Sequence, residues 1–396
     1  MRIYADNAAT TKISKKALLK MTECCESFFG NPSSLHTSGQ LAAEELERAR
    51  AKIARLIGAR ESREIYFTAG GSESDNQAIL SCAIRGAAKG KKHIVSTTFE
   101  HHAVLHVLKK LEKEGFEVTL VDVDKNGLLT AEDIEKAIRP DTCLVTVMFA
   151  NNEIGTILPI AEIGKVCREK GVLFHTDAVQ AVGHVEVNVE EMNIDLLSVS
   201  AHKFNGPRGV GVLYARRGVI LKNLIEGGAQ ERGKRAGTEN LPAIVGMAEA
   251  LRESVEKMRE NEEKLIALRK ILVDGLSKIP HSVLNGSLEK RLPGNVNFCF
   301  EGIEGESLLL LLDDKGVEAS SGSACTSGSL DPSHVLLAIG LPKDVAHGSL
   351  RLTLSPENTP EEAEYIVKCT TEVVEYLRSI SPVWEELETG EREFIL

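Results

Sequence analysis

The stretch Val172-Leu173-Phe174-His175-Thr176-Asp177 and the later stretch Leu196-Leu197-Ser198-Val199-Ser200-Ala201-His202-Lys203 decide the fold of this chain. Each begins with a run of aliphatic, β-branched or aromatic residues, which is typical of a buried strand. Helical patterns lie between most such runs after roughly the first 60 residues, and this alternation predicts an α/β fold with a mostly parallel sheet. Ligands of such sheets bind beyond the carboxyl ends of the strands, so we expect functional residues just after each run.

Four further runs are predicted as strands of the same sheet, at residues 64–68, 93–96, 117–121 and 144–148. Downstream, a long charged stretch from about residue 242 to 279 has a helical pattern, and a last helix is expected from about 360 to 380. The closing segment 384–388 is acidic, and we expect it to be loosely held. With 396 residues, the chain is too long for one compact core and predicts two domains.

Composition and charge limit the class of protein. Hydrophobic residues make up 42% and charged residues 27% of the chain, as in an ordinary globular protein. The net charge of -11 argues against nucleic acid as a partner, because phosphate binding favours an excess of lysine and arginine. Residues 1–6 lack the pattern of a signal peptide, and the leucine run at 308–312 is too short to span a bilayer. We therefore expect a cytoplasmic protein with no membrane partner.

The cysteines divide into one exposed candidate and a structural remainder. The eight cysteines form no CxxC pair and show no metal-ligand spacing, so we expect neither a disulfide framework nor a metal site. Cys325 alone lies in a run of small residues, Ser320-Ser321-Gly322-Ser323-Ala324-Cys325-Thr326-Ser327-Gly328-Ser329. Glycine and serine leave the backbone free, so this run predicts a mobile surface loop. A thiol there is accessible for reaction, although a linker with an incidental cysteine fits the run equally well.

Asp177 and Lys203 each follow one of the two strand runs quoted above. Parallel strands end at the same edge of a sheet, so a carboxylate and an amine are expected on that edge. Pyridoxal phosphate enzymes use such a pair: the lysine forms a Schiff base with the cofactor, and the aspartate keeps the pyridinium nitrogen protonated. An ordinary ion pair at a loop end is the alternative, and without further motifs it is the more common case.

Three more polar segments follow predicted strands. Residues 68–76 contain Gly71 and Ser72 and open a helix, so backbone N–H groups could approach a phosphate there, although an ordinary turn and helix cap has the same pattern. His101 brings an imidazole to the same edge, with a structural histidine or a metal ligand as the alternatives. Asn152 could supply an amide hydrogen bond.

Residues 122–133 nearly match a calcium-binding loop, with Asp133 where a bidentate glutamate is expected. Such a loop needs a helix before it, whereas residues 117–121 have a strand pattern. We therefore predict an ordinary strand-turn-helix connection without calcium.

Taken together, the motifs resemble one known family. They lie at predicted strand ends and in loops along the chain: His101, Asn152, residues 177–180, 200–203 and 228–238, and the Cys325 loop. In order and spacing they resemble the cysteine desulfurases of the NifS/IscS class, and the resemblance runs from residues 4–11 to residues 349–352. It implies the aspartate aminotransferase-like fold, fold type I of the pyridoxal phosphate-dependent transferases. The large domain would comprise residues 15–255, and a smaller α/β domain, residues 1–14 and 256–396, would carry the Cys325 loop.

The resemblance also implies roles for individual residues. Lys203 resembles the Schiff-base lysine, Asp177 the pyridinium partner, and His101 the imidazole that stacks on the cofactor ring and moves protons. Arg351 resembles the clamp for the substrate carboxylate, since a planar guanidinium suits bidentate binding. The remaining residues that the family pattern implies for binding cofactor or substrate are Asn7, Gly71, Ser72, Asn152, Gln180, Ser200, His202 and, from the second subunit of a homodimer, Thr238.

The activity implied by the resemblance is removal of sulfur from L-cysteine, which releases L-alanine and leaves a persulfide on Cys325. The sulfur would pass to an acceptor or iron-sulfur scaffold protein, and Cys325 could ligate an iron-sulfur cluster transiently. Ser72 replaces a common threonine, Ala201 and Ala229 replace common glycines, and the C-terminal end differs from that associated with scaffold docking, so the acceptor stays open. A selenocysteine lyase or related β-lyase is one alternative, and a non-catalytic sulfur carrier of the same fold is another.

Overall fold

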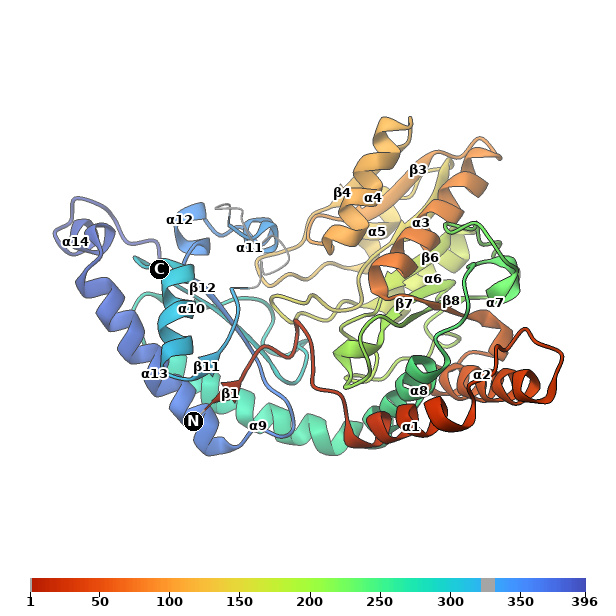
Figure 1. The fold of residues 1–396 in the computed structure, drawn as a ribbon. Coiled ribbons are helices and arrows are strands. Elements are labelled where there is room, and N and C mark those ends of the chain that lie inside the picture. Colours follow the sequence, from red (N-terminus) through yellow and green to blue (C-terminus); the bar gives the residue numbers. More distant parts are fainter. Residues whose placement is uncertain (1, 322–331) are drawn as a thin grey trace.

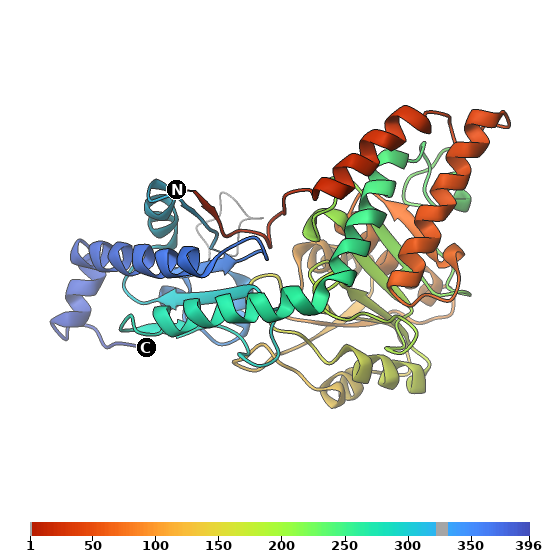
Figure 2. The same cartoon turned by 90° about the horizontal axis from the view of Figure 1, so that it is seen from below.

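The computed structural model describes residues 2–321 and 332–396 of the chain. Figure 1 shows two lobes, a larger one around an extended sheet and a smaller one that contains both termini. In Figure 2 the long helix α9 (Met258–Leu276) runs from the junction with the larger lobe along the smaller one. None of the helices formed by the described residues has the length and apolar composition that crossing a membrane requires.

The larger lobe is built on a seven-stranded sheet. In spatial order its strands are β2 (Ile65–Thr68), β8 (Gly211–Ala215), β7 (Leu196–Ser200), β6 (Leu173–Asp177), β5 (Thr142–Thr146), β3 (His93–Thr97) and β4 (Glu117–Val121). β8 runs antiparallel to both neighbours, whereas the other pairs in this sheet are parallel. The predicted mostly parallel α/β sheet is therefore confirmed. β8 was not predicted, because glycines on both sides make its short run resemble a loop.

Helices cover both faces of this sheet (Figure 1). The helices of the larger lobe are α1 (Lys15–Ser27), α2 (Thr37–Leu56), α3 (Gly71–Ala87), α4 (His102–Lys113), α5 (Ala131–Ala137), α6 (Ile160–Lys170), α7 (Gln230–Gly233) and α8 (Leu241–Glu256). Leu144 and Leu196 pack in the hydrophobic cluster that includes α3 and α4, whereas Val145 and Leu197 pack in the cluster on the opposite face. This alternation follows from the two-residue period of a strand. Because both faces are apolar, the strands are nearly continuous hydrophobic runs in the sequence.

The smaller lobe contains a three-stranded antiparallel sheet in the order β12 (Ser349–Thr353), β10 (Asn295–Phe300) and β9 (Ser282–Leu284). β1 (Ile3–Tyr4) pairs in parallel with β11 (Val317–Glu318). Besides α9, its helices are α10 (Gly305–Asp314), α11 (His334–Ala338), α12 (Lys343–Ala346), α13 (Pro360–Ser379) and α14 (Pro382–Glu388). The predicted last helix corresponds to α13. The predicted charged helical stretch forms two helices, α8 and α9, which meet at Lys257.

One hydrophobic cluster joins the N-terminus to the smaller lobe. Ile3 and Ala5 pack there with buried residues between 265 and 377, although the chain between residues 5 and 265 contributes nothing else to it. This cluster agrees with placing residues 1–14 in the smaller domain. Cys299 and Val335 of the smaller lobe pack with the hydrophobic cluster of the larger lobe, so the two cores are in contact. The domain boundaries at residues 14 and 255 therefore stay a proposal.

The C-terminal segment is held more firmly than the sequence suggested. Leu387 of α14 is buried, and the backbone N–H groups of Ile395 and Leu396 donate to the carboxylate of Glu301, at 2.9 and 3.1 Å. Arg378 lies over the ring of Trp384, with the guanidinium carbon 3.9 Å from its centroid. The expectation of a loosely held end is therefore wrong, because contacts from distant residues compensate for the acidic composition.

The segment that resembled a calcium-binding loop connects β4 to α5. A strand precedes it, and Asp124 Oδ1 accepts hydrogen bonds from the backbone N–H groups of Asn126 and Leu128, both at 2.8 Å. The prediction of a strand-turn-helix connection is confirmed.

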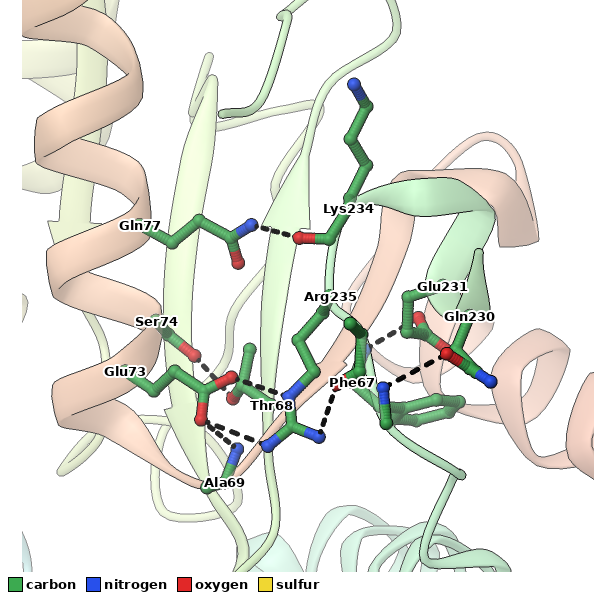
Figure 3. A network of polar contacts seen from close by, with 12 residues as sticks. Phe67, Thr68, Ala69, Glu73, Ser74, Gln77, Gln230, Glu231, Lys234 and Arg235 are labelled. Carbon is green, nitrogen blue, oxygen red and sulfur yellow. Dashed lines mark hydrogen bonds and ion pairs between the residues drawn. The ribbon is translucent and has the colours of Figure 1, made fainter. Parts of the chain in front are cut away.

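A buried ion pair fixes the loop that follows β8. Arg50 in α2 donates from both terminal nitrogens to the carboxylate of Glu231, each at 2.7 Å. The backbone N–H of Phe67 donates to the same carboxylate at 2.9 Å (Figure 3). Glu231 and Arg232 both have left-handed backbones, with φ of 47° and 57°. This conformation costs free energy for residues with a side chain, so the ion pair must compensate for it.

We predict that Arg50→Ala lowers the free energy of unfolding by about 3–5 kcal/mol, because it leaves the Glu231 carboxylate buried without a cation. Urea denaturation followed by circular dichroism measures the change. The control is Arg48→Ala on the same helix, whose side chain is 64% exposed and whose loss should cost less than about 0.5 kcal/mol. Equal losses in the two variants would contradict the role of the ion pair.

Candidate active site

Lys203 lies in the short 3₁₀ helix η2 (Ala201–Lys203), directly after β7. Its Nζ donates to the carbonyl oxygens of Ala8 and Ala9, at 2.6 and 2.9 Å. Gln180 Nε2, on the loop after β6, donates to the same Ala8 carbonyl at 3.0 Å. The fold thus brings Lys203 and Gln180 together at the carboxyl edge of the sheet, against a segment from the N-terminus.

Asp177 is the last residue of the neighbouring strand β6 and is almost fully buried. Its Oδ1 accepts a hydrogen bond from the backbone N–H of Val179 at 3.0 Å. Burial raises the pKa of this carboxyl, and the nearby positive charges of His101 and Lys203 act in the opposite direction. A buried carboxylate in this position is suited to a cationic partner.

A second buried carboxyl lies near Asp177. His175 bonds through Nδ1 to Thr146 Oγ1 at 2.8 Å and through Nε2 to Ser198 Oγ at 3.0 Å, and burial lowers its pKa to about 3. Its Nε2 also lies 3.6 Å from Asp75 Oδ1. Burial, and then the charge of Asp177, raise the pKa of Asp75 well above its usual range. His175 is therefore neutral near pH 7, and burial favours the protonated form of Asp75, so Asp177 is the carboxylate of this group that a cation can stabilise.

A cavity of about 400 Å³ lies at the same edge, beside the first turn of α3. Its lining combines four predicted site residues with six others: Gly71, Ser72, Ser200, His202, Thr10, Ala69, Gly70, Glu73, Arg208 and Gly209. α3 has 17 residues and no side-chain cap at its N-terminus, so its first N–H groups are suited to an anion. A Cβ on Gly71 would lie 2.6 Å from Val179 Cγ2, which explains the need for glycine there.

His202 and Arg208 form one wall of this cavity. His202 Nδ1 bonds to Thr10 Oγ1 at 3.1 Å, and Arg208 Nε donates to the same oxygen at 3.3 Å. Burial lowers the pKa of His202 to about 4, assisted by the charges of Lys203 and Arg208. His202 is therefore neutral near pH 7 and contributes a hydrogen bond rather than a charge.

His101 caps the N-terminus of α4, just after β3. Its Nδ1 accepts a hydrogen bond from the backbone N–H of Ala103 at 3.1 Å. With Nδ1 as the acceptor, the proton of the neutral ring is assigned to Nε2. Its charge also lowers the pKa of the buried Asp177, so the two groups act on each other.

Glu100 precedes His101 and is fully buried. Its Oε1 accepts hydrogen bonds from Thr97 Oγ1 at 2.6 Å and from the backbone N–H of Met148 at 2.9 Å. Oε2 is buried without a hydrogen-bond partner among the described residues. Burial raises the pKa of Glu100 to about 8.

Arg351 projects from β12 of the smaller lobe and is nearly fully buried. Its Nη2 donates to Asp6 Oδ1 at 2.8 Å, and Nη1 donates to the backbone carbonyl of Asn152 at 3.1 Å. Nε is buried and has no hydrogen-bond partner within the part of the chain that the structure describes. The guanidinium is thus held from two sides and keeps one unsatisfied donor.

Asn7 and Thr238, two other predicted site residues, do not line the cavity beside α3. Asn7 Nδ2 donates to the carbonyl of Thr353 at 2.8 Å, so it links the N-terminal segment to β12. Thr238 is exposed and does not line the cavity beside α3. Cys325 lies outside the described residues. Among those that are described, no group of three histidine, cysteine, aspartate or glutamate side chains is placed to hold a metal ion.

The loop that leads to Thr238 is tied to the start of α3. Arg235 Nε donates to Glu73 Oε1 at 2.9 Å, and Glu73 Oε2 accepts from the backbone N–H of Ala69 at 3.0 Å (Figure 3). Gln77 Nε2 donates to the carbonyl of Lys234 at 2.8 Å, one turn further along the same helix (Figure 3). These bonds fix the position of residues 234 and 235 against α3, and with it the start of the segment that leads to Thr238.

Sequence reasoning missed four residues that the fold brings to this region: Asp6, Thr10, Asp75 and Arg208. Asp6 and Thr10 belong to the segment 4–11, whose motif pointed to the family but not to a contact with residues 202 or 351. Arg208 lies in the glycine-rich stretch 206–209, five residues after Lys203. This nearness to Lys203 was the signal in the sequence that could have identified it as a site residue. Asp75 had none, since an acidic residue near the start of a helix usually interacts with the helix dipole.

The sequence and fold match a known family. Residues 3–366 match the model of the family described as Aminotransferase class-V. The chain belongs to this family. Among its relatives, a Cysteine desulfurase IscS from Clostridium botulinum (strain Hall) is 51% identical over 395 residues, or 99% of both chains. A Cysteine desulfurase IscS from Methanosarcina thermophila is 51% identical over 381 residues, covering 96% of this chain and 94% of its own.

Solved structures of class-V aminotransferase relatives have the same fold. A structure described as a NIFS-like protein superimposes with a TM-score of 0.89 at 38% identity, over 95% of this chain and all of its own. A second, described as SspA in complex with cysteine, has a TM-score of 0.80 at 36% identity, over 91% of this chain and all of its own. The fold class predicted from the sequence is confirmed.

We predict that Glu100→Gln gains stability relative to the parent chain as the pH rises. The folded carboxyl has a pKa of about 8 against an ordinary 4.5, so the unfolded state binds fewer protons between these values. The parent chain therefore loses stability on going from pH 5 to 8, by up to about 1.4 kcal/mol per pH unit, and the variant lacks this loss.

Urea denaturation of both proteins at pH 5.5, 7 and 8 measures the effect. Glutamine keeps an oxygen for the two hydrogen bonds that Glu100 Oε1 accepts, so the comparison isolates the charge. A difference between the two proteins that stays constant across this range would disprove the buried titration.

Proposed function

We propose that this chain is a cysteine desulfurase, which uses pyridoxal phosphate to remove sulfur from L-cysteine and leaves L-alanine and a persulfide on Cys325. The geometry that carries the proposal is the amine of Lys203 and the buried carboxyl of Asp177 at the carboxyl ends of neighbouring strands, near enough for the charge of the amine to lower the pKa of the carboxyl. Full-length relatives that are 51% identical and named cysteine desulfurases support it. Neither a selenocysteine lyase nor a non-catalytic sulfur carrier is favoured by these relatives.

The residues present fit pyridoxal phosphate. The uncapped start of α3 and the cavity beside it suit the phosphate, with Gly71, Ser72, Ser200 and His202 as its contacts. Burial raises the pKa of the Asp177 carboxyl, and a protonated ring nitrogen would supply a cation that stabilises its charged form. When bound, the cofactor links covalently to an amine and withdraws electrons from the substrate Cα.

Lys203 would hold the cofactor through its amine, and the same amine would move the proton at the substrate Cα. In the structure its Nζ donates hydrogen bonds to the Ala8 and Ala9 carbonyls, and these bonds orient the amine. Gln180, which shares the Ala8 carbonyl, and Asn152 are assigned to the cofactor's phenolic oxygen and the substrate. This arrangement supports a base at Lys203 whose position depends on the N-terminal segment.

Arg351 binds the substrate carboxylate. Its unsatisfied Nε supplies a donor, and the bonds from Nη2 to Asp6 and from Nη1 to Asn152 hold the guanidinium plane. Asn7, bonded to Thr353 two positions after Arg351, lies at the same entrance.

His101 exchanges a proton through Nε2, since Nδ1 is occupied by the N–H of Ala103. With its help the thiol of Cys325 becomes a thiolate, which attacks the sulfur of the bound cysteine. A sulfur–sulfur bond forms, the carbon–sulfur bond breaks, and its electron pair leaves with the carbon, which takes up a proton to become alanine. The products balance as L-alanine and a Cys325 persulfide.

A homodimer would complete the site, with Thr238 of one subunit reaching the phosphate of the other. Thr238 is exposed in the single chain, which is compatible with a role outside its own cavity. Large apolar side chains near the start of α2 are also exposed, Phe29 by 78% and Leu35 by 91%, and a second subunit would cover such residues. The persulfide sulfur then passes to an acceptor or iron-sulfur scaffold protein. On such a scaffold, Cys325 could also ligate an iron-sulfur cluster transiently.

We predict that Lys203→Ala abolishes the visible absorbance of the lysine-bound cofactor and lowers alanine production by about 10²-fold or more, because both the covalent link and the base are lost. Cys325→Ser should keep the absorbance but end sulfide release from L-cysteine. Spectra of the purified proteins and an alanine assay measure both. Normal turnover by Cys325→Ser would remove the thiol from the mechanism.

We predict that Asp6→Asn raises the KM for L-cysteine roughly tenfold, because Arg351 loses the charge-assisted hydrogen bond that orients it. The kcat and the cofactor absorbance should change much less. The control is Asp313→Asn, an exposed aspartate of the smaller lobe. A fall in kcat at unchanged KM would contradict the assignment of Arg351 to the substrate carboxylate.

A further inference from the structure

A second cavity lies at the opposite edge of the large sheet. It has a volume of about 310 Å³ and is lined by the C-terminal end of α3, the first residues of β5 and β6, and the turn after β8. Lys203 and Asp177 lie at the carboxyl ends of β7 and β6, whereas this cavity touches the amino ends of the parallel strands. The two cavities share no lining residue.

This second cavity is strongly basic. Its lining includes Arg85, Lys89, Lys91, Arg216 and Arg217 but no aspartate or glutamate. The whole chain carries a net charge of -11, so this concentration of cations is a local feature rather than a consequence of composition. Low-dielectric walls strengthen the attraction of such a cluster for an anion.

Three of these cations have no carboxylate partner among the described residues: Arg85, Lys89 and Lys91. Arg85 Nη1 donates to the carbonyl of Gly218 at 3.0 Å, and Lys91 Nζ lies 3.5 Å from the carbonyl of Thr142. These bonds position the side chains but leave their charges uncompensated.

The other two cations share their carboxylates with further arginines. Arg216 Nε donates to Asp195 Oδ1 at 2.6 Å, and Arg168 Nη2 lies 3.6 Å from the same oxygen. Arg217 Nη1 donates to Glu61 Oε1 at 3.0 Å, and Glu61 also pairs with a second arginine. Each carboxylate therefore offsets only one of two positive charges, and the wall stays positive.

The C-terminal end of α3 accounts for only part of this cluster. Cations in or just after the last turn of a helix offset its dipole, and this explains Arg85 and Lys89. It does not explain Arg216 and Arg217, which come from the turn after β8, whereas Lys91 follows Lys89 in the turn after α3. Two segments far apart in the chain thus supply cations to one hollow, which is a pattern typical of a binding site.

The shape of the cavity is compatible with a small ligand. Cys82, Cys143 and Leu173 supply apolar lining, while Gly171 and Gly218 have left-handed backbones with φ of 66° and 95°. A Cβ on either of these glycines would meet no atom within 4 Å, so open space lies beside them. A volume of this size is at the lower end of the range of small-molecule pockets, about 300–1,000 Å³.

We propose that this cavity binds a small anion with two or more phosphate groups, of which inorganic pyrophosphate is the simplest. Guanidinium forks match the oxygens of phosphates, and several cations from separate segments can contact an extended polyanion but not all contact a single carboxylate. The site is separate from the phosphate position of the cofactor and does not depend on the proposed reaction.

Isothermal titration of the cofactor-loaded enzyme with pyrophosphate tests the proposal, because the bound cofactor already occupies the other anion site. Lys89→Glu and Lys91→Glu should each weaken pyrophosphate binding by roughly tenfold or more, through loss of a charge-assisted contact and added repulsion. The matched control is Lys109→Glu, an exposed lysine of α4 outside the cavity, which should leave the affinity unchanged. Cofactor absorbance and alanine production should stay at the parent level in all three variants.

Absence of binding by the parent enzyme at millimolar pyrophosphate would overturn the proposal. Equal affinity in the Lys89→Glu, Lys91→Glu and Lys109→Glu proteins would also overturn it, since the anion would then bind elsewhere. Titration with orthophosphate and with adenosine diphosphate separates the possible sources: a free oligophosphate site binds pyrophosphate best, and a nucleotide site binds the diphosphate best. Binding of a short RNA without binding of pyrophosphate would identify a nucleic-acid surface and reject the small-anion site.

Discussion

The burial of the Asp177 carboxyl is the constraint on which the rest of the site depends. A buried carboxylate is costly unless a cation or several N–H groups compensate for it, and the fold supplies one backbone N–H together with the more distant charges of His101 and Lys203. Burial lowers the pKa of the neighbouring His175 and raises that of Asp75, so both groups favour their neutral forms. The strand end is therefore suited to the cationic ring that we propose for this site.

The N-terminal segment joins the two lobes around that strand end. The carbonyls of Ala8 and Ala9 hold the Lys203 amine from one side, while Asp6 holds the Arg351 guanidinium from the other. Residues 6 to 9 thus contact the proposed base and the proposed carboxylate clamp at once. A displacement of this short segment would change the orientation of both groups. The motif of polar and small residues in this segment therefore serves to position the Lys203 amine and the Arg351 guanidinium.

Two cavities suited to anions lie at opposite edges of the large sheet. The carboxyl edge combines buried acids with an amine and an anion cavity at the start of α3, and the amino edge carries the basic cavity around Arg85 and Lys91. α3 connects the two, because its N-terminus lines one cavity and its C-terminus the other. In the two proposed sites, the same helix would present backbone N–H groups to one anion and side-chain cations to a second.

The sequence by itself determined the parallel strands, the ends at which Asp177 and Lys203 lie, the last helix and the family, because strand periodicity and motif order are local properties of a chain. It did not predict β8, the firmly held C-terminus, the Asp6–Arg351 pair or the basic cavity. Each of these joins residues far apart in the chain, as Asp6 and Arg351 or Arg85 and Arg216 are, and their partnership exists only once the chain is folded. Tertiary structure decided them because burial and charge compensation depend on distance in space, not on spacing in the sequence.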